Sequence, residues 1–146
     1  MKPAKETVKE SASILIIEDK ADWVRIITRA CEGAGFTVRS ASTLAKAVSL
    51  LNNQVFDAVV ADIRLKDWQA GNIEGLDALG AVSEERRPAA VVLSAFADYD
   101  NTRLAFAGFK VIDVLRKSAF DANEFVLKLK QAIRETRRKR HLGKQH

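Results

Sequence analysis

The chain has 146 residues and a formal net charge of +5, and its balance of 47% hydrophobic and 29% charged residues is typical of one soluble globular domain. No apolar run approaches the roughly 20 residues that cross a bilayer, and the polar first residues carry no export signal, so we expect a cytoplasmic protein that does not contact a membrane. The single cysteine, Cys31, excludes an internal disulfide and is expected to be a buried, inert thiol.

The positive charge is concentrated near the carboxyl end of the chain. Residues 134–146 hold six of the 24 Lys and Arg residues and one of the 19 acidic residues, so the rest of the chain is neutral. We therefore expect one domain at 13–135 between a polar tail at 1–12 and a basic tail at 136–146. Three interpretations of the basic tail stay open: a solvated helix end, a linker to a further domain, or a contact for nucleic acid or an acidic partner.

The first half of the chain alternates between strand and helix patterns. An apolar run at 14–17 predicts a buried strand, and a stop signal at 33–35 separates the next helix from a second strand at 36–41. A third strand is predicted at 58–61. The apolar faces of the two intervening helices are Trp23, Ile26, Ile27 and Ala30, then Leu44, Ala47, Val48 and Leu51, the second capped by Ser42 or Thr43.

The second half continues the alternation. Strands are predicted at 90–93 and 111–115, and a weaker helix pattern with Asp98 as its cap occupies 98–107. The other two helices have these apolar residues: Leu76, Leu79 and Val82, then Phe125, Leu129, Ala132 and Ile133 from a start near Asp121. Five alternations predict an α/β fold, a doubly wound five-stranded parallel sheet of the flavodoxin-like type with strand order 2-1-3-4-5.

Polar residues follow four of the five predicted strands. Glu18 and Asp19 follow the first strand, Asp62 the third, Ser94 the fourth and Lys117 the fifth. In a doubly wound sheet the carboxyl ends of the strands form the functional edge, so these side chains are expected to converge there.

Three carboxylates placed this close would oppose one another's ionisation. A hard divalent cation removes the conflict, and Mg²⁺ prefers carboxylate oxygens. Asp62 would then bind the metal through one oxygen and attack an electrophile with the other, while the metal would neutralise charge on a transferred phosphoryl group. Lys117 offers a charge and Ser94 a hydrogen bond to the same phosphoryl oxygens.

At this point the chain resembles the receiver domain of two-component response regulators over roughly residues 13–135. The resemblance depends on polar residues in the right order after the right strands: Glu18, Asp19, Asp62, Ser94 with Ala95, and Lys117. It implies that Asp62 accepts a phosphoryl group from a sensor histidine kinase or a phosphotransfer protein. It also implies a Mg²⁺ site made by Glu18, Asp19, Asp62 and the backbone carbonyl of Arg64.

Three features depart from the family pattern. Ser118 replaces the proline that usually follows the lysine, so we expect no cis peptide bond there. Val114 replaces the usual switching aromatic residue. The loop at 63–75 is longer than usual and carries Trp68, which is interpreted either as a partner contact or as simple packing.

The leading hypothesis is a phosphoacceptor module that is not a turnover enzyme and that signals to a downstream protein or to an output domain absent from this sequence. The alternative is a receiver-like interaction module that works without phosphorylation, which Val114 and Ser118 favour. A haloacid-dehalogenase-type phosphohydrolase is less well supported, because Arg64 stands where that family has a second aspartate. Homodimer formation stays open, and only the basic tail is a candidate for contact with nucleic acid.

Overall fold

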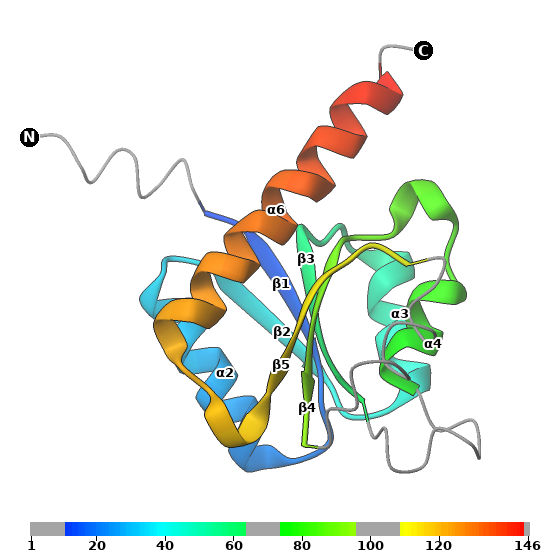
Figure 1. The fold of residues 1–146 in the computed structure, drawn as a ribbon. Coiled ribbons are helices and arrows are strands. Elements are labelled where there is room, and N and C mark those ends of the chain that lie inside the picture. The colour runs from blue at the N-terminus through cyan, green and yellow to red at the C-terminus, as the bar shows by residue number, and fades with distance from the viewer. Residues whose placement is uncertain (1–10, 64–73, 96–108, 145–146) are drawn as a thin grey trace, which may run out of the picture.

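The computed structural model describes residues 11–63, 74–95 and 109–144. Five parallel strands form one sheet in the order β2-β1-β3-β4-β5, which confirms the predicted flavodoxin-like topology (Figure 1). The strands are β1 (Ser13–Ile17), β2 (Thr37–Ala41), β3 (Ala58–Ile63), β4 (Ala90–Ser94) and β5 (Val111–Arg116).

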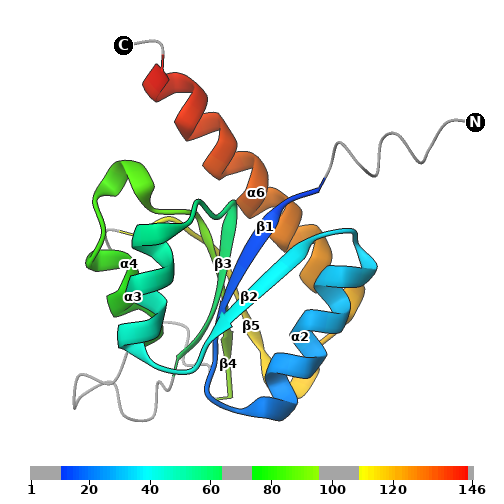
Figure 2. The same cartoon turned by 180° about the vertical axis from the view of Figure 1, so that it is seen from behind.

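Helices cover both faces of the sheet. The α-helices are α2 (Ala21–Gly33), α3 (Leu44–Asn53), α4 (Glu74–Gly80) and α6 (Ala122–Lys144), and two short 3₁₀ turns are η2 (Glu84–Arg86) and η3 (Lys117–Ala119). Figure 2 shows α3 and α4 on one face and α2 and α6 on the other. The helix expected at 98–107, with its cap Asp98, lies outside the described residues.

Successive residues of each central strand enter two different cores. Leu15 and Ile17 pack under α3 and α4, whereas Ile14 and Ile16 pack under α2 and α6. Because side chains alternate across a strand, a strand covered on both faces must be apolar at every position. This packing explains the continuous apolar runs in the sequence.

The predicted apolar face of α2 is correct except at one position. Ile27 and Cys31 are buried, and Trp23 and Ala30 pack beside them, but Ile26 is 41% exposed. Ile26 lies 100° around the helix from Ile27, on the side away from Cys31, so it faces solvent. Burial raises the pKa of the Cys31 thiol to about 12, and nearby Glu32 adds to the effect, as expected of an inert thiol.

The helix caps also follow the sequence. Thr43 is the N-cap of α3, and its hydroxyl accepts a hydrogen bond from the Lys46 N–H at 3.2 Å. At the start of α6, the Asp121 carboxylate accepts a hydrogen bond from the Glu124 N–H at 3.3 Å. The residues predicted to face inward from α6 are all buried: Phe125, Leu129, Ala132 and Ile133.

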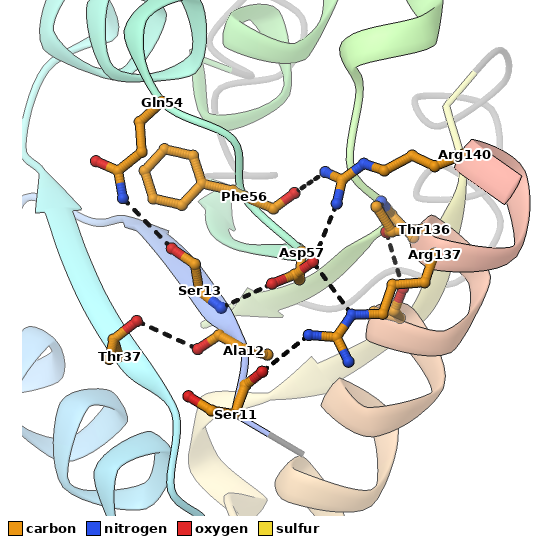
Figure 3. A network of polar contacts seen from close by, with 12 residues as sticks. Ser11, Ala12, Ser13, Thr37, Gln54, Phe56, Asp57, Thr136, Arg137 and Arg140 are labelled. Atoms are coloured by element: carbon orange, nitrogen blue, oxygen red, sulfur yellow. Dashed lines mark hydrogen bonds and ion pairs between the residues drawn. The ribbon is translucent and has the colours of Figure 1, made fainter. Parts of the chain in front are cut away.

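The far end of α6 is bound to the amino-terminal edge of the sheet, although its sequence was expected to be a basic tail. Figure 3 shows Arg137 and Arg140 of α6 pointing at Asp57, which precedes β3. Their nitrogens lie 3.3 and 3.0 Å from Asp57 Oδ1, and the Ser13 N–H donates to Oδ2 at 2.9 Å. The domain limits at 13 and 135 stay predictions, but basic residues beyond them do contact the body.

Within the ranges that the structure describes, no helix combines the length and the apolar character needed to cross a membrane.

Candidate functional site

Strand pairing brings the predicted polar residues to one edge of the sheet. Ile17 is the register partner of Ala61, so Glu18 and Asp62 follow neighbouring positions of β1 and β3. Ser94 ends β4 and pairs with Arg116 of β5, which places Lys117 directly beyond that pair. The residues therefore converge as expected, because parallel strands end at the same edge.

Three carboxylates form a cluster at this edge. Glu18, Asp19 and Asp62 each offer an oxygen, and these oxygens lie within 4.8 Å of one another. The Glu18 side chain is fully buried, the Asp62 side chain is 10% exposed, and Asp19 lies at the surface. The cluster therefore extends from the protein interior to solvent, and Asp62 lies at the boundary.

Lys117 lies between two of these carboxylates. Its Nζ is 2.8 Å from Glu18 Oε1 and 3.0 Å from Asp62 Oδ1, and its side chain is 7% exposed. The other Glu18 oxygen accepts a hydrogen bond from the Lys20 N–H at 3.1 Å. One ammonium group shared between carboxylates leaves an excess of negative charge, which favours binding of a cation.

An aromatic ring completes the surroundings of Lys117, and sequence reasoning had assigned that ring to the core only. The Lys117 Nζ lies 5.0 Å from the centroid of the Trp23 ring, within the range of a cation–π interaction. Trp23 also contacts Phe120 edge-to-face, with centroids 5.6 Å apart. The one sequence signal for this contact was the position of Trp23 in the first turn of the helix that follows the acidic pair.

The remaining predicted positions differ in how far the structure describes them. Ser94 is fully buried at the end of β4, and Val114 is partly buried against the core under α3 and α4. The described residues contain no cis peptide bond, in agreement with the expectation for Ser118. Arg64 and Trp68 lie outside the described residues.

Comparison with known sequences identifies the family. Residues 14–130 match the family model of the response regulator receiver domain. The chain is 32% identical over 119 residues to the photosynthetic apparatus regulatory protein RegA of Rhodovulum sulfidophilum, covering 80% of this chain and 61% of that protein. It is 29% identical to the acid tolerance regulatory protein ActR of Rhizobium meliloti (strain 1021), covering 82% of this chain and 58% of that protein. The chain thus spans roughly three fifths of the length of these relatives.

Solved structures share the fold. A sensor protein from Polaromonas sp. JS666 is 27% identical, with a TM-score of 0.66 and coverage of 86% of this chain and 98% of that one. A CheY-like receiver domain protein from Methanospirillum hungatei JF-1 has a TM-score of 0.70 at 19% identity, with coverage of 88% and 98%, and this likeness shows the fold alone. The family match over most of the chain and the acidic cluster at the expected strand ends lead to one conclusion: the chain belongs to the receiver domains of two-component response regulators.

Proposed function

We propose that this domain is a phosphoacceptor, and that Asp62 takes the phosphoryl group from a phosphohistidine of a sensor kinase or phosphotransfer protein. The observation that carries the proposal is the cluster in which Asp62 lies with two further carboxylates and 3.0 Å from the Lys117 ammonium. Phosphoryl transfer needs positive charge beside a nucleophilic oxygen, and this cluster combines the nucleophile with the charge.

Exposure supports Asp62 as the acceptor among the three carboxylates. The Glu18 side chain is fully buried and both of its oxygens have protein partners, Lys117 and the Lys20 N–H. Asp19 is exposed and suited to hold a metal at the surface. The Asp62 side chain is 10% exposed, which leaves access for a donor, and its Oδ1 lies 3.0 Å from the Lys117 Nζ.

The donor set fits Mg²⁺. All three side chains offer carboxylate oxygens, the ligands that this hard cation prefers, and their spacing allows one ion to be shared. Glu18, Asp19 and Asp62 would hold the ion, with the backbone carbonyl of Arg64 as a further ligand. The bound ion would supply neutralisation of charge on the phosphoryl oxygens.

In the transfer step, an Asp62 carboxylate oxygen forms a bond to phosphorus while the bond from phosphorus to the histidine nitrogen breaks. Lys117 is already beside Asp62 and would pair with a phosphoryl oxygen, and the Ser94 hydroxyl would donate a hydrogen bond to another. The acyl phosphate is the signal, and it shifts the population of surface conformations that a downstream protein or domain recognises. Hydrolysis of the acyl phosphate resets the domain, so we propose a signalling role and no turnover of a substrate.

The test is labelling by acetyl phosphate in the presence of Mg²⁺, followed by intact mass spectrometry. Wild-type protein should gain one phosphoryl group, and Asp62→Asn should gain none. Asp22→Asn is the matched control, because the Asp22 side chain is 83% exposed and forms an ion pair only with Arg25 among the described residues. Labelling that persists in Asp62→Asn would overturn the assignment.

A phosphorylation-independent interaction module is the competing function. It predicts that the Asp62→Asn protein, captured with its cellular partners, binds the same proteins as wild type. Loss of those partners together with loss of the label would instead support signalling through Asp62.

A further inference from the structure

We propose that Trp23 is a positioning residue for the phosphoryl site, and that its ring holds the Lys117 ammonium beside Asp62. The effect on phosphorylation rests on the function proposed above. The contact itself is independent of that function and is tested separately below.

The Lys117 ammonium has two kinds of neighbour. The carboxylates of Glu18 and Asp62 lie 2.8 and 3.0 Å from Nζ. The Trp23 ring centroid lies 5.0 Å from the same nitrogen. The Lys117 side chain is 7% exposed, and a cation–π contact gains strength when water is excluded. The ammonium is therefore located by three groups, and only two of them are charged.

The Trp23 ring is itself held in place. It packs edge-to-face on Phe120, at an interplanar angle of 80°, and Phe120 packs on the buried Phe125 with centroids 5.4 Å apart. Phe120 follows η3, the 3₁₀ turn that begins with Lys117, and Phe125 belongs to α6. The aromatic stack therefore connects α2, the segment that carries Lys117, and α6, so that tilting of the indole is restricted.

Lys117 has a particular need for such support. Its ammonium is a compact point charge on a flexible four-carbon chain, so the side chain does not fix the position of the charge by itself. Ser118 follows it, so the backbone lacks the fixed φ angle that a proline would impose. Ring contact from α2 supplies a restraint that the backbone does not provide.

The Trp23 ring should contribute most to the position of the Lys117 ammonium when the carboxylates bind a metal ion. Carboxylate oxygens that bind a metal ion are shared with it and attract the ammonium less strongly. The contact with Trp23 does not involve those oxygens and is unaffected. We therefore expect loss of the ring to slow phosphorylation at saturating Mg²⁺, in addition to any effect on stability.

The kinetic test compares Trp23→Leu with Trp23→Phe at saturating Mg²⁺. Trp23→Leu should label with acetyl phosphate about three- to tenfold more slowly than wild type, and Trp23→Phe, which keeps a ring, should label at an intermediate rate. The packing control is Ile27→Ala, one turn along α2, which removes buried volume from the same core that Trp23 packs against. Wild-type rates in Trp23→Leu, or equal slowing in Ile27→Ala, would overturn the proposal.

A spectroscopic test needs no phosphoryl donor. The chain has two tryptophans, so Trp68→Phe leaves Trp23 as the sole indole. In that background, Lys117→Met should shift the emission maximum of Trp23, because it removes the charge over the ring. Identical spectra would show that the contact is absent in solution and would overturn the inference. If the spectra shift but wild-type protein takes no label, the proposed function fails while the contact stands.

Discussion

The two ends of β3 each have an aspartate that pairs with cations, yet the surroundings of the two carboxylates differ. Asp57 precedes the strand and is 15% exposed, and Asp62, near its other end, is 10% exposed, so burial does not distinguish them. Asp57 accepts from one backbone N–H and pairs with two guanidinium groups, those of Arg137 and Arg140. At the other end, two carboxylates share the ammonium of Lys117 and a third lies close by.

The difference lies in the balance of charge. Burial alone would raise the pKa of Asp57, but the Ser13 N–H together with Arg137 and Arg140 outweighs burial and lowers the pKa. That carboxylate is satisfied by the protein and serves to hold α6 against the sheet. At the Asp62 end negative charge is in excess, so the cluster is suited to bind a metal ion. The charge around each aspartate therefore differs: the Asp57 carboxylate is matched by protein cations, and the Asp62 cluster has negative charge left for a bound cation.

The largest expected effect on stability is at the structural end. Asp57→Ala removes the acceptor for one backbone N–H and two guanidinium groups, and should lower the free energy of unfolding by about 3 kcal/mol. Urea unfolding followed by circular dichroism measures the loss. Under conditions in which the variant is folded, it should still take the label on Asp62. A folded Asp57→Ala protein that takes no label would show that the two ends are not separate.

At the Asp62 end, the matching experiment is the addition of Mg²⁺. A ligand that binds only the folded state stabilises it, by about 2.7 kcal/mol at a hundredfold excess over Kd. Mg²⁺ should therefore raise the thermal midpoint of wild type, and Asp19→Asn, which removes one carboxylate of the cluster, should reduce the rise. Asp22→Asn serves as the control and should respond like wild type. An equal rise in Asp19→Asn would exclude Asp19 as a ligand.

The sequence predicted the polar cluster at the Asp62 end of β3 better than the contacts at the Asp57 end. Glu18, Asp62 and Lys117 could be predicted because each follows an apolar run, and parallel strands bring such positions together. The role of Asp57 could not be predicted, because its partners Arg137 and Arg140 reach it only through the angle and length of α6. A contact that forms only in the tertiary structure leaves no periodic pattern in the sequence.

The aromatic contact at Lys117 escaped prediction for a related reason. Trp23 was assigned to the core from helical spacing, and spacing does not show which part of a ring meets a neighbour. Ile26 was wrongly assigned to the same face, because a four-residue pattern cannot fix the centre of a buried stripe to better than one position. The way α2 packs against the sheet determines both the contact of Trp23 with Lys117 and the exposure of Ile26.

Acid should reduce the contribution of Asp57 to stability, which is a smaller effect with a definite sign. Because the pKa of Asp57 is lowered by folding, its contribution to stability is present above the unfolded pKa of about 4 and is lost as pH falls through the lower folded pKa. The gap in unfolding free energy between wild type and Asp57→Asn should therefore be constant from neutral pH to about pH 4 and should shrink below it. Urea titrations across that range measure the gap. A gap that widens in acid would contradict the lowered pKa.

The smallest effect distinguishes two arginines on the same helix. Arg140 pairs with Asp57 at 3.0 Å and also donates to the Phe56 carbonyl, and its side chain is 27% exposed. Arg138 pairs with Glu135 one turn back, with 60% of its side chain exposed. Because exposed ion pairs contribute little, Arg138→Ala should leave the free energy of unfolding nearly unchanged, whereas Arg140→Ala should lower it by about 1 kcal/mol. Equal losses of unfolding free energy in the two variants would mean that Arg140 behaves as a solvated residue. The contact between Asp57 and α6 would then depend on Arg137 alone.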